Sequence, residues 1–441
     1  MLTTTDQNCK LESIPYAVRW VLFGDGERFP ILIRPADGQP LFHPTVYTIA
    51  LLRGRGVASN TLLASLRSIL HLYVWAATEK LDLEGRLRSS RLLTVPEIES
   101  LTRAMRQPLR ALLDEQVDEQ NGSAMRGIAS LERFRKRSPD DRGSQVGLST
   151  TGVRLRYVCA YLDWFTLDQL STIKECDHTA HESARKRMLD AIAARIPISH
   201  VRPGEDARQG LVPETLTQLL SVIDRSSAEN PWKDDDLRLR NQLLIMMLLQ
   251  LGIRRGEALG IRIEHIDLRQ NSLLIVRAAD DPEDPRKYQP NTKTRDRKLP
   301  LSDDLADMLQ HYITRVRNKI EGARFHSFLF VAHDTGRPMS LPAFGKVFHT
   351  LRERVADLPD NLCGHMLRHT WNDRFSALMD SHGASEENEK KLRSYLMGWS
   401  ESSETAARYT RRYTKRRATE LSIEMQKSLM EKGDEGEDGG D

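Results

Sequence analysis

The sequence predicts a mainly α fold with a small antiparallel β-sheet, divided between a helical N-terminal domain and a mixed α+β C-terminal domain. Apolar residues recur at helical spacing over residues 46–192 and again from residue 303. Only short apolar runs within 15–40 and 272–301 have the pattern of strands. A chain of 441 residues is also longer than one hydrophobic core usually serves, which favours two or three domains.

Composition excludes several classes of protein. The mean hydropathy is -0.50, and the longest apolar run, Leu243–Leu249, is too short to cross a membrane. The first residues lack the basic-then-apolar layout of a signal peptide. Four scattered cysteines, with no Cys-x-x-Cys pair, predict neither a disulfide framework nor a zinc site. We therefore expect a soluble, cytoplasmic protein.

The charge is unevenly distributed. The chain has 65 Lys and Arg against 62 Asp and Glu, for a net charge of +3. Residues 431–441 hold six acids and one base, which leaves +8 on residues 1–430. Arginine outnumbers lysine by 49 to 16, and its planar guanidinium suits bidentate contacts with phosphate. Nucleic-acid binding and codon bias explain this excess equally well.

The N-terminal half begins with a short β element and continues as helices. Two apolar runs, Trp20–Phe23 and Phe29–Ile33, flank a Gly-Asp-Gly turn. The similar stretches Thr61–Trp75 and Thr150–Trp164 each begin with a threonine that could cap a helix. No fixed period continues between them, so two ordinary amphipathic helices are expected rather than a repeat. The polar, Gly- and Ser-containing residues 114–149 predict a loop or mobile segment.

The C-terminal half starts after a Pro- and Gly-rich boundary at 196–211, with a new helix predicted from Pro213. The run Leu243–Leu249 is apolar on all sides, as expected for a helix at the centre of a core. Ser272–Arg277 and Arg297–Leu301 are predicted to pair as strands, and helices follow from Asp303 to about residue 430. The acidic residues 431–441 have a disordered composition.

The first chemistry-bearing cluster follows that central helix, which is predicted to end at Gly252. Arg254, Arg255 and Glu257 then fall within one turn of the next helix start. An arginine held there, near a helix N-terminus, is well placed to bind an anion. The alternative is a solvated turn with a surface ion pair.

The second cluster is His-Met-Leu-Arg-His-Thr at 365–370. On a helix, His365, Arg368 and His369 share one face. A zinc site is disfavoured because Met366 occupies the position where a His-Glu-x-x-His motif needs glutamate. A satisfied buried histidine beside a surface arginine is the other interpretation.

The third cluster places Tyr409 among Arg408, Arg411 and Arg412. Alone, such a tyrosine is most often a surface residue with a stacked guanidinium. Together, the clusters supply arginines for one anion, a histidine, and a phenol whose pKa the cations would lower. These groups suit nucleophilic attack on a phosphodiester without a metal.

Four motifs in order resemble the tyrosine recombinase (phage integrase) family over residues 211–425. They are Gly-Ile-Arg-x-x-Glu, Lys-Thr-x-x-Arg-x-Leu-Pro-Leu, His-x-Leu-Arg-His-Thr and Gly-Trp-Ser followed by Thr-x-x-x-Tyr. The helical residues 46–195 are similar in character to the core-binding domain of that family. The resemblance implies a helical core-binding domain and a mixed α+β tyrosine-recombinase catalytic domain. The implied ranges are 1–45 for an N-terminal β element or extra module, 46–200 for the core-binding domain, 205–430 for the catalytic domain and 431–441 for a disordered acidic tail.

The resemblance also implies roles for individual residues. Arg254 and Arg368 would hold the scissile phosphate, and Tyr409 would attack it to form a 3′-phosphotyrosyl link. Lys293 matches the β-hairpin lysine that protonates the departing 5′-oxygen. Tyr413 is a second phenol nearby, but Thr405 stands four residues before Tyr409 as in the family pattern.

Further residues match the motifs less directly. His365 matches the first histidine of His-x-x-Arg, and Trp399 falls where members carry His or Trp. An indole N–H donates a hydrogen bond but does not shuttle protons, so Trp399 is expected to be a hydrogen-bonding and packing element. Glu257 matches an acidic position that supports the arginines. His369 fits as a supporting residue, and Arg255 as a helper at most.

The implied function is site-specific DNA recombination without metal, ATP or another cofactor, in a protein of the bacterial nucleoid and of mobile elements. The implied partners are double-stranded DNA with a specific recombination site and three further copies in a homo-tetramer, with residues 418–432 as a helix exchanged between copies. A second recombinase or DNA-bending factor is a further candidate partner. A non-catalytic DNA-binding protein and a type IB topoisomerase-like strand relaxase are the alternatives. Residues 375–395, longer and more polar than is usual in the family, suggest a loop or small insertion.

Overall fold

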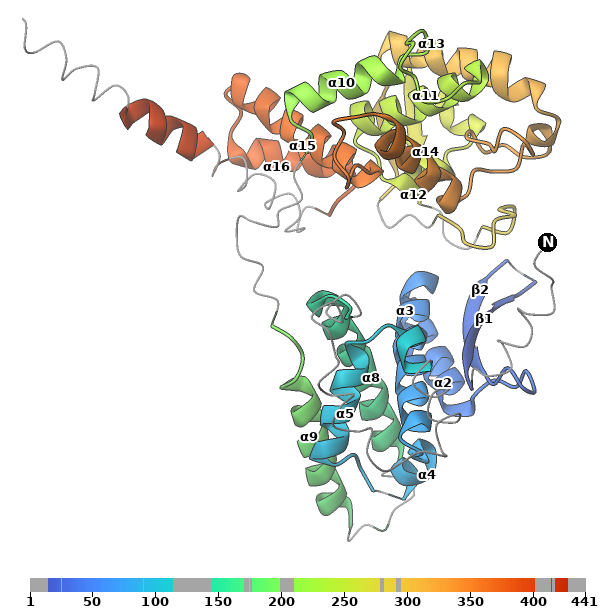
Figure 1. Ribbon diagram of the computed structural model, residues 1–441, viewed down its shortest axis with the longest axis vertical. Helices are drawn as coiled ribbons and strands as arrows, with labels where there is room; N and C mark the ends of the chain where they lie inside the picture. Colours follow the sequence, from blue (N-terminus) through green and yellow to red (C-terminus); the bar gives the residue numbers. More distant parts are fainter. Residues whose placement is uncertain are drawn as a thin grey trace, which may run out of the picture. The chain divides into compact units, whose positions relative to one another are not determined.

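The computed structural model describes residues 15–24, 26–89, 91–113, 145–169, 174, 177–198, 210–277, 281–290, 295–400, 414 and 417–426. The chain forms two compact units, Met1–Arg202 and Pro203–Asp441 (Figure 1). Each unit has its own hydrophobic core. No helix in the described part of the chain is both long and apolar enough to cross a membrane.

The first unit combines a β-hairpin with a set of helices. Its elements are β1 (Ala17–Leu22), β2 (Arg28–Ile33), α2 (Phe42–Val46), η1 (Tyr47–Leu52), η2 (Arg53–Arg55), α3 (Ser59–Thr78), α4 (Leu83–Arg88), α5 (Val95–Met105), α8 (Leu148–Asp168) and α9 (His178–Ala193). Helices α3 and α8 pack side by side, and β2 lies against α3. Leu32 of β2, Leu66 of α3 and Val158 of α8 are completely buried in one core. The hairpin is therefore part of the core of this unit.

The predicted hairpin strands and the two long helices are confirmed, but the predicted caps are wrong. The helices begin earlier, with Ala58 and Gly147 at the N-cap positions instead of Thr61 and Thr150. The N–H of Thr61 already donates to the carbonyl of Ala58 at 2.7 Å, so Thr61 lies inside the first turn. Of the predicted loop at 114–149, residues 114–144 lie outside the described residues.

The second unit is built around α11. Its elements are α10 (Pro213–Ile223), α11 (Asp235–Leu251), α12 (Arg255–Gly260), η6 (Ile263–His265), β3 (Ile266–Asp267), β4 (Ser272–Ile275), β5 (Arg297–Pro300), α13 (Asp303–His311), η7 (Tyr312–Val316), η8 (Arg317–Lys319), η9 (Glu321–Phe325), α14 (Leu341–Arg354), α15 (Gly364–Ser381) and α16 (Glu386–Met397). Leu243, Ile245 and Leu248 of α11 are completely buried. The predicted central helix and the helix start at Pro213 are thus confirmed.

The sheet of the second unit has the order β3-β4-β5 and is antiparallel throughout. The predicted pairing of two strands is confirmed, with Leu273 opposite Leu299 and Ile275 opposite Arg297. Strand β3 was not expected from the sequence because its two residues give no periodic pattern. Along β5, Arg297 and Leu299 face the interior and Lys298 faces solvent, as the two-residue period of a strand requires.

Residues 375–395 are helical except for the turn at 382–385, so the predicted loop is wrong over most of this segment, while the small insertion stays a prediction. Helix α15 continues to Ser381, a short turn passes through Gly383 at φ 63°, and α16 begins after the N-cap Ser385. The segment is polar because α16 exposes half of its residues to solvent. Towards the C-terminus, residues 417–426 form a helix whose apolar side chains are exposed, while 427–441 lie outside the described residues.

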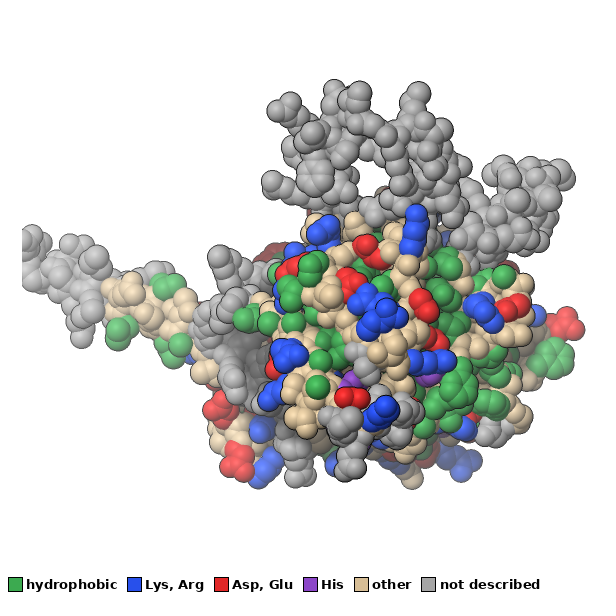
Figure 2. Space-filling view, turned by 90° about the horizontal axis from the view of Figure 1, so that it is seen from below, with side chains coloured by type: hydrophobic (Ala, Val, Ile, Leu, Met, Phe, Trp, Pro, Cys, Tyr) green, Lys and Arg blue, Asp and Glu red, His purple; other side chains and the backbone are tan. Residues whose placement is uncertain are grey.

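Charged side chains of both signs share the surface. Figure 2 shows one face of the molecule, on which Lys and Arg side chains are interspersed with Asp and Glu side chains. In the first unit, Arg86, Arg185 and Arg195 each form an ion pair with an acidic side chain. Part of the arginine excess is therefore engaged in ion pairs within the protein.

Candidate active site

The candidate site forms where α11 ends. Gly252 adopts a left-handed conformation (φ 60°), and its N–H donates to the carbonyl of Leu248 at 3.1 Å. A Cβ atom at this position would lie 2.8 Å from the Trp371 ring and from Met397 Cε. Both the backbone conformation and the lack of space therefore require glycine here. The chain then turns, and Arg254 occupies the N-cap position of α12.

Glu257 stabilises this turn through hydrogen bonds to its carboxylate. Its carboxylate accepts the main-chain N–H of Arg254 at 2.8 Å and Nη1 of Arg254 at 3.3 Å. Nη2 of Arg297 donates to the same carboxylate at 2.9 Å. The Glu257 side chain has no solvent exposure, whereas that of Arg254 is 36% exposed. The alternative of a solvated surface ion pair is therefore wrong. The main chain of Arg254 is held by a buried carboxylate, while solvent and ligands reach its guanidinium.

Arg368 approaches the same turn from α15. It is 2% exposed, its Nη1 donates to the carbonyl of Gly252, and its guanidinium carbon lies 5.4 Å from the centre of the Trp399 ring. The carbonyls of a helix C-terminus have no partner within the helix, so a buried donor stabilises them. Arg368 is thereby fixed at Gly252, which precedes Arg254 by two residues in the chain.

The histidines of α15 lie closer to solvent than the arginine between them. His365 is exposed, His369 is half-buried, and their ring centres are 4.5 Å apart in an edge-to-face arrangement. The prediction that these residues share a helix is confirmed. The alternative of a buried histidine beside a surface arginine is wrong, because burial is reversed between the two.

Trp399 connects the end of α16 to this cluster. Gly398 ends α16 in a left-handed conformation, and the main-chain N–H of Trp399 donates to the carbonyl of Ser394 at 2.9 Å. The Trp399 ring is mostly buried beside Met397 and Trp371.

Strand β5 is attached to this C-terminal segment by two hydrogen bonds. The Nε of Arg297 donates to the carbonyl of Leu396 at 2.7 Å. The main-chain N–H of Arg295, two residues before the strand, donates to the carbonyl of Gly398 at 3.2 Å. Residues of β5, α12, α15 and the α16 end thus meet around the C-terminus of α11.

Lys293 and the whole third cluster, with Thr405, Tyr409, Tyr413 and the arginines at 408, 411 and 412, lie outside the described residues. The structure brings together Arg254, Arg368 and Trp399. Among the described residues, no three His, Cys, Asp or Glu side chains are grouped so that they could hold a metal ion.

Sequence reasoning missed two buried supports of the site. Arg297 was expected only as a strand residue, although its alternation with Leu299 places it on the inward face. Arg393 of α16 is completely buried and donates to Glu389, to the carbonyl of Asn372 at 3.1 Å and to Ser376 Oγ at 2.6 Å. Its spacing of four from Glu389 was the available signal.

Comparison with known proteins gives a family, curated relatives and solved structures that resemble this chain. Residues 211–416 match the sequence model of the phage integrase family. The tyrosine recombinase XerD of Pseudomonas aeruginosa is 25% identical over 193 residues, which cover 40% of this chain and 57% of the relative. XerD of Halalkalibacterium halodurans is 26% identical over 164 residues, covering 36% and 50%. The chain spans about half the length of the curated relatives it matches. Among solved structures, the Tn1549 transposon integrase in complex with a circular intermediate DNA has a TM-score of 0.41 at 17% identity, covering 72% of this chain and 95% of that one.

Proposed function

Because residues 211–416 belong to the phage integrase family of tyrosine recombinases, we propose that the protein is a site-specific recombinase that breaks and rejoins DNA strands. The observation that carries the proposal is the meeting of Arg254, Arg368 and Trp399 at the C-terminus of α11. Two fixed guanidinium groups beside one turn suit a single phosphate group, because each presents a planar fork of donors.

The proposed reaction begins with the scissile phosphate bound by Arg254 and Arg368. The phenol of Tyr409 gives its proton to water as its oxygen attacks phosphorus, a new P–O bond to tyrosine forms, and the bond from phosphorus to the 5′-oxygen breaks. Negative charge develops on the non-bridging oxygens, where each preorganised donor contributes about 2.7–4 kcal/mol to the transition state. The products are a 3′-phosphotyrosyl link and a free 5′-hydroxyl.

Three further residues have supporting roles in this proposal. Lys293 gives its ammonium proton to the departing 5′-oxygen, and His365 assists proton movement or donates a hydrogen bond at the phosphate. Trp399 packs against Arg368 and fixes its plane. One phosphoester bond replaces another, so a second DNA end reverses the step without ATP.

The proposed partners are duplex DNA and further copies of this chain. The first unit would serve as the DNA-clamping domain, and four copies would assemble on paired sites. Leu421, Ile423 and Met425, exposed on the helix at 417–426, support an exchange of this helix between copies.

A covalent-trapping experiment tests the proposal. The full chain selects a binding site from a pool of random duplexes, and the selected site is rebuilt as a nicked suicide duplex. We expect a covalent protein–DNA adduct that is lost in Tyr409→Phe and retained in Tyr413→Phe. No adduct on a bound site would favour a non-catalytic DNA-binding protein, and relaxation of a supercoiled plasmid lacking the site would favour a topoisomerase-like activity.

A further inference from the structure

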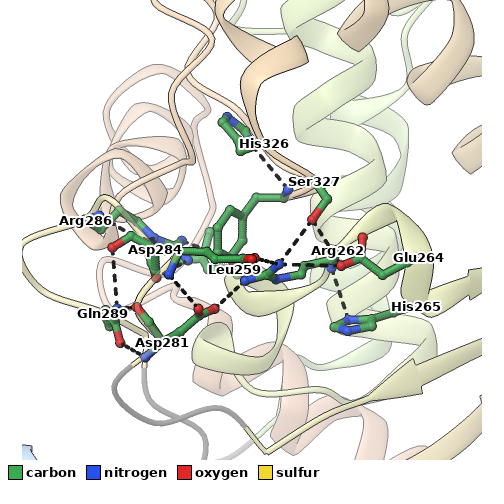
Figure 3. A network of polar contacts seen from close by, with 12 residues as sticks. Leu259, Arg262, Glu264, His265, Asp281, Asp284, Arg286, Gln289, His326 and Ser327 are labelled. Atoms are coloured by element: carbon green, nitrogen blue, oxygen red, sulfur yellow. Dashed lines mark hydrogen bonds and ion pairs between the residues drawn. The ribbon is translucent and has the colours of Figure 1, made fainter. Parts of the chain in front are cut away.

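A polar network holds one segment of the connection between β4 and β5 (Figure 3). Arg262, which follows α12, donates to Asp281 and to Glu283, each at 2.6 Å. Arg286 donates to the carboxylate of Asp284 at 2.8 Å. It also donates to the main-chain carbonyls of Leu259 and Met339, each at 3.0 Å. The segment 281–290 is therefore bound to two different parts of the second unit.

Phe328 lies between the two arginines. The guanidinium carbons of Arg262 and Arg286 are 4.9 Å and 4.5 Å from the centre of its ring, within the range of cation–π attraction. Burial would lower the pKa of Arg262, but its bonds to Glu283 and Asp281 raise that pKa above its ordinary value. The guanidinium therefore stays charged while it is partly desolvated.

Gln289 closes the segment on itself. Its side-chain oxygen accepts the N–H of Asp281 at 2.9 Å, and its side-chain nitrogen donates to the carbonyl of Asp281 at 2.5 Å. Asp284, Arg286 and Gln289 are all buried. The segment thus has a defined conformation up to Pro290.

Lys293 follows Pro290 by three residues and precedes Arg295 by two. On the C-terminal side, Arg295 is bound through its main chain to Gly398, next to Trp399. On the N-terminal side, the network leads through Arg262 to α12, which starts at the Arg254 turn. Only four residues separate these two anchored points, and each residue spans at most about 3.6 Å.

We propose that Arg262 and its partner Asp281 are positioning residues for Lys293, because they fix the N-terminal end of the short segment that carries it; this inference rests on the proposed function. Ion pairs are a weak source of net stability, because exposed pairs contribute little and apolar residues often replace buried pairs without loss. The charges around residues 281–290 are therefore better explained by a need to hold this segment in a precise geometry than by a gain in stability. A proton donor must come within about 3 Å of its acceptor, and a misplacement of about 1 Å can cost 100-fold in rate.

The chemistry of the leaving group separates this role from general damage to the fold. In normal DNA, the bond from phosphorus to the 5′-oxygen breaks and the oxygen takes the proton of the Lys293 ammonium. When sulfur replaces that bridging oxygen, the thiolate leaves without a proton, because thiols have a pKa of about 8.5, far below the pKa of hydroxyl groups. A residue that acts through Lys293 therefore matters for the oxygen substrate and not for the sulfur substrate.

The experiment measures single-turnover adduct formation on the selected suicide duplex, with oxygen or sulfur at the bridging 5′ position. Arg262→Met keeps an unbranched side chain over Phe328 but removes the charge. We expect about a tenfold slower rate on oxygen DNA and a rate within about twofold of the parent on sulfur DNA, as general acid catalysis contributes about 10²–10⁴-fold. Asp281→Asn, which keeps the oxygen that accepts the N–H of Glu283 at 3.0 Å, should behave likewise.

Reference variants allow each result on oxygen and sulfur DNA to be interpreted in one way. Lys293→Ala should show the same pattern more strongly, Arg254→Ala should be slow on both substrates, and Arg324→Met, changed at an exposed arginine bonded to a main-chain carbonyl, should match the parent. Equal slowing of both substrates by Arg262→Met and Asp281→Asn, or no slowing by either, overturns the inference while the proposed function stands. No adduct from the parent chain overturns the proposed function and this inference with it.

Discussion

Arg297 and Glu257 form a 2.9 Å ion pair in which the two side chains are only 2% and 0% exposed. Removing one partner of a buried pair leaves the other charge without compensation, which costs about 3–5 kcal/mol. We expect Arg297→Met to lower the free energy of unfolding of the second unit by up to about this amount in urea titrations, since Glu257 keeps its 3.3 Å contact with Arg254.

A matched variant at the surface provides the control for that measurement. Arg225 pairs with Asp235, and these side chains are 37% and 61% exposed. Arg225→Met should cost no more than about 1 kcal/mol. The double variant Arg297→Met with Glu257→Gln should be more stable than Arg297→Met alone, because the buried carboxylate that has lost its closest partner is gone. Equal losses in the buried and exposed variants would contradict this explanation.

Gly252→Ala should damage both the fold and the site. A left-handed conformation costs a non-glycine residue about 1–2 kcal/mol, and the new Cβ would meet Trp371 and Met397 at 2.8 Å. We expect a loss of at least about 2 kcal/mol in unfolding free energy and reduced adduct formation, because the carbonyl that receives Arg368 must move. Gly260→Ala is the control, since a Cβ added there would have no neighbouring atom within 4 Å, and a change of more than about 1 kcal/mol in this variant would argue against this reasoning.

Substitutions of Trp399 distinguish packing from hydrogen bonding by its indole N–H. The ring lies 5.4 Å from the Arg368 guanidinium carbon and is mostly buried. Trp399→Phe keeps an aromatic face, and we expect it to retain adduct formation within about tenfold. Trp399→Ala also opens a cavity and should lose about 3–5 kcal/mol of stability. If Trp399→Phe loses as much activity as Trp399→Ala while staying folded, the indole N–H is the essential group.

The stability of the first unit should fall on acidification because of His71 in α3. Burial, with a further contribution from the nearby Arg154 guanidinium, lowers the pKa of His71 from 6.5 to about 4. The unfolded chain therefore binds a proton that the folded chain does not between pH 6.5 and 4. Stability is complete above pH 6.5 and decreases towards pH 4, by about 3 kcal/mol for this shift.

Hydrogen exchange of α3 peptides in urea, followed from pH 7 to pH 4.5, measures this effect within the full chain. His71→Gln retains a donor for the carbonyl of Gln107, which His71 contacts at 3.2 Å, and should reduce the pH dependence. His349→Gln, on the exposed surface of the second unit, should leave it unchanged. An unchanged slope in His71→Gln would show that other groups control the acid sensitivity of this unit.

Features that depend on local pattern were predictable from the sequence. The run Leu243–Leu249 followed by Gly252 indicated a buried helix and its end, and Pro213 indicated a helix start. The alternation around Leu299 indicated a strand. In each case neighbouring residues alone determine the signal.

Features that depend on tertiary contacts were not predictable. Helical periodicity places His365 and Arg368 on one face but does not say which of them meets a neighbouring helix. Arg368 is buried because the unsatisfied carbonyl at Gly252 requires a donor, and that contact joins residues 116 positions apart. The polar composition of 375–395 concealed helix α16, whose buried side includes the charged Arg393 and Glu389.

The partner of Arg368 is a main-chain carbonyl, and this limits how the contact can be lost over evolutionary time. Every amino acid at position 252 carries that oxygen, so no exchange of side chain there deletes the acceptor itself. The contact can be lost only through a new residue at 368 or a backbone shift at the end of α11. Substitutions at position 252 therefore disturb this interaction only by moving the backbone, whereas substitutions at position 368 remove the donor itself.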